Sequence, residues 1–189
     1  MIGREEVKIY LIRHGEAKSA WNEDPDPGLS DKGKIQAREL VSKILPEITN
    51  ETRLISSPLL RARETYLPVE SKIHSAAEIN LNFAEIPSPG IALKERKEWL
   101  RKIFDMNIVD LGQPQKEWRN KIIECCKLIK NDTFIFSHFM VINCVVGWIN
   151  SYKKIVNFYP NNCSVTKILK KDNKFLIEEL GNELGTIVQ

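Results

Sequence analysis

A histidine between an arginine and a glycine, Arg13-His14-Gly15, directly follows an apolar stretch at residues 7–12. The stretch is rich in β-branched and other apolar side chains, which predicts a buried strand. Its end brings an imidazole, a fixed positive charge and a closely approaching backbone to one point. This combination suits attack by a ring nitrogen on an anionic substrate. A single histidine after a strand is more often an ordinary surface residue, so the interpretation depends on the rest of the chain.

Two further predicted strands end in polar groups of the same kind. A strand at residues 53–57 ends in two serines and is followed by Arg61, and a strand at residues 133–137 is followed by His138. In open α/β sheets, ligands bind at the carboxyl ends of the strands. Each of these ends is a weak signal alone, but together on one sheet edge they would gather two arginines and two histidines. The set therefore favours a catalytic site.

The chemistry that such a set could perform is phosphoryl transfer. A phosphate monoester carries about two negative charges at neutral pH, and two arginines with a second histidine could hold its non-bridging oxygens. A neutral imidazole in line with phosphorus can attack it and form a phosphohistidine, which water then hydrolyses. Arginines can supply the positive charge, and the sequence shows no carboxylate cluster typical of a Mg²⁺ site. We therefore expect neither a metal nor another cofactor.

The elements that must position these residues alternate between strands and helices. After a turn-rich loop, Ser30 is placed to cap a helix that runs to about Leu45. The apolar face expected for this helix consists of Ile35, Val41, Ile44 and Leu45. Apolar spacing predicts further helices at residues 92–104, 115–130 and 141–149, and a terminal strand pair at residues 164–169 and 175–180. This order predicts an α/β fold, a three-layer α/β/α sandwich with a mostly parallel central sheet.

Length and composition indicate one globular domain. The 189 residues are 42% hydrophobic and 28% charged, and we expect a single domain over residues 1–189 with a small lid region at about 66–115. Lys and Arg total 28 against 25 for Asp and Glu, a formal charge of +3 that is dispersed along the chain. Such a balance argues against a nucleic-acid partner.

Targeting and thiol signals point to the cytoplasm. The four cysteines lack the spacing of zinc ligands, so we expect free and mostly buried thiols. The most apolar run, at residues 139–149, is far shorter than the roughly 20 residues of a membrane span. The first strand begins within a few residues of the start, without the hydrophobic region of a signal peptide. The expectation is a cytoplasmic protein with no membrane partner; the sequence carries no signal on its oligomeric state.

Four short motifs occur in order along the chain. They are R-H-G-E at residues 13–16, L-S-D-K-G-K-I-Q-A at 29–37, S-S-P-L-L-R-A-R-E-T at 56–65 and F-S-H at 136–138. Each resembles a motif of the histidine phosphatase superfamily, branch one, which includes the cofactor-dependent phosphoglycerate mutases. The resemblance implies a phosphoglycerate mutase-like fold.

The resemblance also assigns roles. It implies that His14 is the nucleophile, that Arg13, Arg61 and His138 bind the phosphate, and that His138 belongs to the catalytic set. The general acid of the family lies between the second and third strands, where Glu85 fits best. Glu85 would protonate the leaving alcohol and then activate water. The alternative for Glu85 is an exposed carboxylate in a loop.

The chain departs from the mutases of this family near the expected site. Ile86 and Pro87 stand where mutases carry Arg and Tyr, and Ala20 stands where they place Asn. The acidic stretch at residues 23–26 would repel a polyanion such as a bisphosphoglycerate, although it can equally be a solvated turn. Phe139 replaces the glycine that usually follows the last histidine, where it could narrow the pocket or pack beneath it.

These departures favour hydrolysis. The leading hypothesis is a metal-independent phosphatase that acts on a small phosphomonoester or a phosphorylated protein side chain. The alternatives are a phosphoglycerate mutase-type isomerase and a non-catalytic, phosphate-binding regulatory protein.

Overall fold

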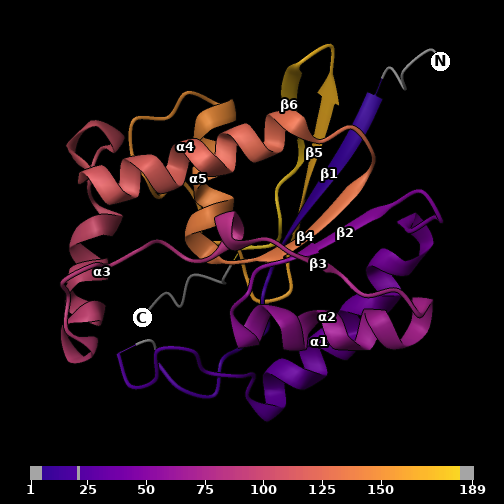
Figure 1. Ribbon diagram of the computed structural model, residues 1–189, viewed down its shortest axis with the longest axis horizontal. Coiled ribbons are helices and arrows are strands. Elements are labelled where there is room, and N and C mark those ends of the chain that lie inside the picture. Colours follow the sequence, from indigo (N-terminus) through magenta and orange to yellow (C-terminus); the bar gives the residue numbers. More distant parts are fainter. Residues whose placement is uncertain (1–5, 21, 184–189) are drawn as a thin grey trace.

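A six-stranded sheet forms the centre of the computed structural model, which describes residues 6–20 and 22–183 (Figure 1). Its strands are β1 (Glu6–Arg13), β2 (Arg53–Ser56), β3 (Glu78–Ile79), β4 (Thr133–Ser137), β5 (Val165–Lys171) and β6 (Lys174–Glu179), in the order β3-β2-β4-β1-β5-β6. The first four strands in this order are parallel, and β5 runs antiparallel to both of its neighbours. The prediction of a mostly parallel sheet is confirmed.

Helices cover both faces of the sheet (Figure 1). The helices are α1 (Asp31–Ile44), α2 (Leu60–Ile73), α3 (Arg96–Phe104), α4 (Gln113–Leu128) and α5 (Phe139–Ile149). One face packs against α1 and α2, and the other packs against α4 and α5. The short helix α3 lies at the end of the second layer, beside the carboxyl ends of the parallel strands. The three layers are those that the sequence predicted.

The central strand β1 shows why both faces must be covered. Ile9 and Leu11 belong to the core on the α4 and α5 side, whereas Tyr10 and Ile12 belong to the core under α1 and α2. Successive side chains of a strand point to opposite faces, so an uninterrupted apolar strand needs a layer on each side. Burial of each such side chain contributes about 1.5–3 kcal/mol. This double core holds the site-bearing end of β1 in place.

The buried face of helix α1 differs from the face that the sequence predicted. The N-cap is as predicted, because the Ser30 hydroxyl accepts a hydrogen bond of 3.0 Å from the backbone N–H of Gly33. The buried face instead runs through Ala37, Leu40, Val41 and Ile44. The expected apolar positions Ile35 and Leu45 are wrong, since they are 48% and 38% exposed. Ile35 lies two residues before Ala37, which places it on the opposite side of a helix with 3.6 residues per turn.

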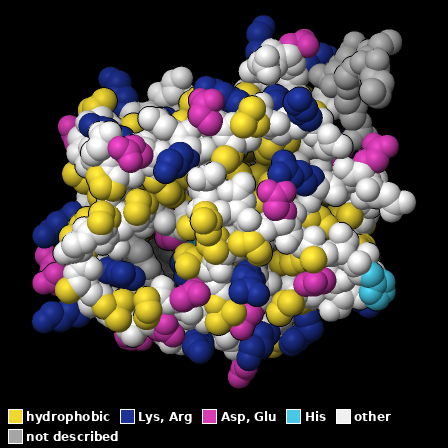
Figure 2. All heavy atoms as spheres, in the orientation of Figure 1, with side chains coloured by type: hydrophobic (Ala, Val, Ile, Leu, Met, Phe, Trp, Pro, Cys, Tyr) yellow, Lys and Arg dark blue, Asp and Glu magenta, His cyan; other side chains and the backbone are white. Residues whose placement is uncertain are grey.

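The surface charges and the state of the cysteines agree with the expectations from composition. No helix among the described residues has both the length and the apolar character that crossing a bilayer requires. Charges of both signs are interspersed on the face seen in Figure 2. All four cysteines are free thiols, and three of them are buried, as expected. The cytoplasmic location stays a prediction.

Two glycines let the loop after β1 lie directly against the first turn of α1. A Cβ added to Gly33 would come within 2.1 Å of the Glu16 carbonyl oxygen, and one added to Gly15 within 2.7 Å of the Gly33 carbonyl oxygen. Both obstacles are backbone atoms, which cannot rotate away as a side chain could. The approach therefore requires glycine on both sides.

Gly33→Ala should lower the free energy of unfolding by about 1–3 kcal/mol, because the loop must shift to admit the methyl group. In an open helix position the same change stabilises by about 0.5–1 kcal/mol. Urea denaturation followed by circular dichroism measures the effect. Lys34→Ala, on the exposed side of the same turn, is the control and should stay within about 0.5 kcal/mol of wild type. A Gly33→Ala protein as stable as wild type would contradict this account.

Candidate active site

The carboxyl ends of β1, β2 and β4 meet at one edge of the sheet. In the register of the sheet, Arg13 lies opposite Ser137. The backbone N–H of His14 donates to the Ser137 carbonyl at 3.0 Å, and that of Ser57 donates to the Phe136 carbonyl at 2.9 Å. The residues that follow the three strands are thus side by side.

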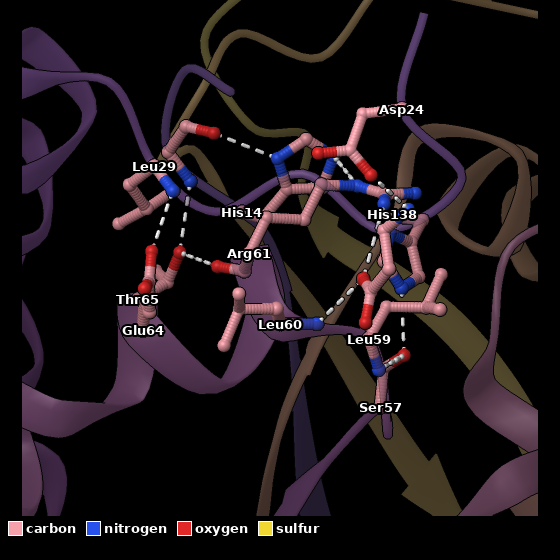
Figure 3. A network of polar contacts seen from close by, with 12 residues as sticks. His14, Asp24, Leu29, Ser57, Leu59, Leu60, Arg61, Glu64, Thr65 and His138 are labelled. Carbon is pink, nitrogen blue, oxygen red and sulfur yellow. Dashed lines mark hydrogen bonds and ion pairs between the residues drawn. The ribbon is translucent and has the colours of Figure 1, made fainter. Parts of the chain in front are cut away.

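His14 is held in one orientation. It is 8% exposed, and its Nδ1 lies 2.7 Å from the Gly15 carbonyl oxygen. A carbonyl oxygen only accepts, so Nδ1 carries the proton and Nε2 carries the lone pair. Arg61, from the first turn of α2, donates from Nε to this Nε2 at 3.1 Å. Figure 3 shows the His14 ring and the Arg61 guanidinium facing each other. The unprotonated nitrogen of His14 is therefore Nε2, and its lone pair accepts the hydrogen bond from Arg61.

His138 lies beside His14 and is hydrogen-bonded to Ser57. The two ring centroids are 5.2 Å apart, and Nε2 of the fully buried His138 is 2.7 Å from the Ser57 hydroxyl (Figure 3). Nδ1 of His138 has no hydrogen-bond partner among the described residues. Ser57 was expected at a strand end but not among the site residues.

Arg13 is fixed by a backbone oxygen and an aromatic ring. Its Nη1 donates to the Pro160 carbonyl at 2.7 Å, and its guanidinium carbon lies 5.3 Å from the centre of the Phe139 ring. Within the described residues, Nε of Arg13 and Nη1 of Arg61 are buried without a hydrogen-bond partner. Nη1 of Arg61 has a single longer ion pair, of 3.9 Å, to Asp26. Such donors suit an oxyanion with several oxygens.

Burial and charge keep both imidazoles neutral. The pKa of His14 is lowered well below its ordinary value by burial, and further by the charges of Arg61 and Arg13. Burial is also the main cause of the lowered pKa of His138, followed by the charge of Arg61. A neutral imidazole keeps its lone pair, which a nucleophile needs.

Glu85 has the opposite tendency. Burial raises its pKa, against the lowering effect of a backbone hydrogen bond from Ile86 and of the charges of Arg61 and Arg13. Its Oε1 accepts from the Ile86 N–H at 2.9 Å. A carboxyl group with a raised pKa in a site is suited to donate a proton.

One cavity of about 300 Å³ joins four of the five predicted site residues. Arg13, His14, Arg61 and Glu85 line it, whereas His138 is not part of its wall. The phosphate contact expected of His138 therefore stays a prediction. Helix α3, within the expected lid region at residues 66–115, contributes Leu100 and Phe104 to the wall. Among the described residues, no three His, Cys, Asp or Glu side chains are grouped so that they could hold a metal ion.

Several residues that shape the site were missed as functional positions. The Thr65 hydroxyl accepts from the Gly15 N–H at 2.9 Å, and Gln36 accepts from the Glu16 N–H at 2.8 Å. Asn162 donates to the His14 carbonyl at 3.0 Å. Thr65 and Gln36 occur in the family-like motifs, so a signal for them was present. Asn162 lies outside those motifs, and no sequence signal identified it.

The sequence matches a known protein family over most of its length. The description "Histidine phosphatase superfamily (branch 1)" belongs to a family model that matches residues 9–183. The chain belongs to this superfamily. Among curated proteins, none matches the chain significantly in sequence.

Some solved structures with the same fold carry the names of different enzymes. Phosphoserine phosphatase from Entamoeba histolytica, a mutant solved with phosphoserine, has a TM-score of 0.69 at 20% identity, covering 92% of this chain and 95% of its own. YhfR from Bacillus stearothermophilus has a TM-score of 0.75 at 19% identity, covering 94% and 98%. Phosphoglycerate mutase from Bacillus anthracis has a TM-score of 0.67 at 17% identity, covering 93% of each chain. At these identities the likeness establishes the fold alone.

The two buried histidines should remain neutral in mildly acidic solution. As the pH falls from about 8 to about 5.5, an unshifted imidazole would gain its proton near pH 6.5, but the lowered pKa values of His14 and His138 place that step at more acidic pH. Ring-proton shifts in a nuclear magnetic resonance titration should stay constant over this range for both residues. A midpoint near the ordinary value for His14 would contradict the neutral state.

Proposed function

We propose that this protein is a phosphatase that hydrolyses phosphomonoesters through a phosphohistidine on His14, without a metal ion. The observation that carries the proposal is the orientation of the His14 ring. Its Nδ1 proton is held by the Gly15 carbonyl, while its Nε2 lone pair faces Arg61 at the wall of a cavity. Membership of the superfamily supports the same activity. The guanidinium groups of Arg61, which is buried, and of Arg13, which is half-buried, supply the positive charge that a metal would otherwise provide.

The first chemical step transfers the phosphoryl group to His14. The phosphate oxygens draw the Arg61 N–H away from Nε2, which frees the lone pair to attack phosphorus. The P–N bond forms while the bond from phosphorus to the ester oxygen breaks. Protonated Glu85 gives its proton to that oxygen, so a neutral alcohol leaves and Glu85 becomes a carboxylate.

The second step returns the site to its starting state. The Glu85 carboxylate accepts a proton from water, and the water oxygen attacks phosphorus. The P–N bond breaks, its electron pair returns to Nε2, and inorganic phosphate leaves. Overall, ester and water become alcohol and phosphate, and Glu85 is protonated again. The raised pKa of Glu85, which burial causes, suits a group that alternates between acid and base.

The acidic loop at residues 23–26 supports the proposal of hydrolysis over isomerisation. Asp26 accepts a hydrogen bond of 2.8 Å from the Leu60 N–H, which anchors the loop at the start of α2. This anchor brings the Asp26 carboxylate to 3.9 Å from Arg61, and Asp24 lies on the same side (Figure 3). A mutase ligand with a second anionic group would meet these carboxylates. The loop therefore suits a substrate with a single phosphate group.

His14→Ala should lower kcat/KM for 4-nitrophenyl phosphate by at least about 1000-fold, because the attacking atom is removed. Steady-state kinetics measures the loss, and acid quenching of the wild-type reaction should trap a phosphorylated protein that this variant lacks. His74→Asn is the matched control, because His74 is an exposed histidine at the end of α2. Turnover by His14→Ala would exclude the covalent mechanism.

Glu85→Gln should slow esters of poor leaving groups more than esters of good ones. An alkyl alcohol needs protonation as it leaves, whereas 4-nitrophenolate does not, so we expect a loss of about 100-fold or more for an alkyl phosphate and a smaller one for 4-nitrophenyl phosphate. The ratio of the two kcat/KM values measures the effect. Equal losses would remove Glu85 from the role of acid.

A mutase assay with 3-phosphoglycerate tests the choice between hydrolysis and isomerisation. Isomerisation faster than hydrolysis would overturn the hydrolase proposal.

A further inference from the structure

A large part of the wall of the candidate active-site cavity is apolar. Helix α3 contributes Leu100 and Phe104, α5 contributes Phe139 and Met140, and the following loop contributes Tyr159. Of the side chains that would hold the phosphate, Arg13 adjoins this wall, with its guanidinium carbon 5.3 Å from the centre of the Phe139 ring, and His14 and Arg61 line the same cavity. The leaving group of a bound ester would therefore contact this apolar wall.

Three of these side chains form one aromatic cluster. Phe104 and Phe139 are stacked, with ring centroids 5.2 Å apart and planes 12° apart. Tyr159 lies 6.3 Å from Phe104 and 5.7 Å from Phe139, at steep angles to both. Phe139 is almost buried, but Tyr159 is 49% exposed. Phe104 and Tyr159 can therefore cover a further ring, and aromatic rings pack well in stacked or edge-to-face contacts.

The same wall offers nothing to an anionic leaving group. Among the described residues that line the cavity, the cationic side chains are Arg13 and Arg61, the two that are expected to bind the phosphate. The other polar side chains among these described lining residues are His14, Ser19, Glu85 and Tyr159, and none of them carries a fixed positive charge. The carboxylates of Asp24 and Asp26 add negative charge near Arg61. A carboxylate or second phosphate on the leaving group would lose water without gaining a partner.

We propose that the cluster of Phe104, Phe139 and Tyr159 selects small phosphomonoesters whose alcohol carries an aromatic group. The proposal rests on the phosphatase function proposed above and names its substrate class. A cavity of about 300 Å³ is at the small end of the range for small-molecule sites, which fits a phosphate with one ring. Phe139, which stands where the family usually has glycine, is then part of a specificity wall and more than a packing residue.

Two esters with leaving groups of similar basicity test the proposal. Ethyl phosphate and 2-phenylethyl phosphate both release a primary alcohol, so the chemistry is alike and the ring is the main difference. Burial of the ring should raise kcat/KM for 2-phenylethyl phosphate about 10- to 100-fold over ethyl phosphate. 3-Phosphoglycerate, which carries a carboxylate, should be a poorer substrate than 2-phenylethyl phosphate.

Variants of the cluster should reduce this preference. Phe104→Ala, and independently Tyr159→Ser, should each bring the ratio of the two kcat/KM values down by about 5-fold or more, because part of the ring contact is lost. Two variants are used because Phe104 is half-buried and Tyr159 is half-exposed, so a folding defect in one leaves the other informative. Lys102→Ala, an exposed position on the same helix as Phe104, is the control and should keep the wild-type ratio.

The outcomes separate this proposal from the function on which it rests. Equal kcat/KM values for the two esters, a preference for 3-phosphoglycerate, or a ratio unchanged in both cluster variants would overturn the aromatic preference. Hydrolysis that still depends on His14 would in that case leave the phosphatase function standing. Failure of wild type to hydrolyse any phosphomonoester would overturn the function, and the substrate class with it.

Discussion

The hydrogen bond between His14 Nδ1 and the Gly15 carbonyl determines the chemistry of the whole site. It selects one tautomer of the ring and leaves the other nitrogen unprotonated, as the proposed attack on phosphorus requires. The peptide that makes this bond is itself held, because the Gly15 N–H donates to Thr65. The Thr65 hydroxyl in turn donates to the Arg61 carbonyl at 2.7 Å. His14, the proposed nucleophile, and Arg61 are therefore positioned by one connected unit, and a shift of the Gly15 peptide would move both.

The positive charge of Arg61 is largely shielded from solvent by the surrounding protein. Arg61 is 4% exposed and His14 is 8% exposed, and burial of a charged group is unfavourable unless partners compensate. Glu85 and Asp26 compensate only in part, since Glu85 tends to hold its proton. A phosphate dianion would complete the balance. The same charges would bind it and also lower the pKa of both imidazoles, so the proposed binding and the proposed nucleophilicity have a common cause.

Helix α5 and the loop after it connect the phosphate end to the aromatic wall. Asn143 accepts hydrogen bonds from the backbone N–H groups of Asn157 at 2.7 Å and Phe158 at 3.2 Å. This buried amide ties the loop to the helix, and the next residues are Tyr159 of the wall and Pro160, whose carbonyl holds Arg13. The proposed contact surface for the leaving group and the backbone anchor of Arg13 are therefore coupled through one side chain.

The residues of the site were identifiable from the sequence because their signals are local. The apolar strands and the polar residues that follow them, around His14, Arg61 and His138, lie within short segments, and the same holds for the Ser30 cap. Only the tertiary structure decided which surfaces meet. The 48% exposure of Ile35 depends on which side of α1 faces the sheet, and the bond between Ser57 and His138 joins residues 81 positions apart. The aromatic wall joins α3 to a loop some fifty residues later. Hydrophobic periodicity shows that a face is apolar but not what it packs against, because that depends on how distant elements fill the same space.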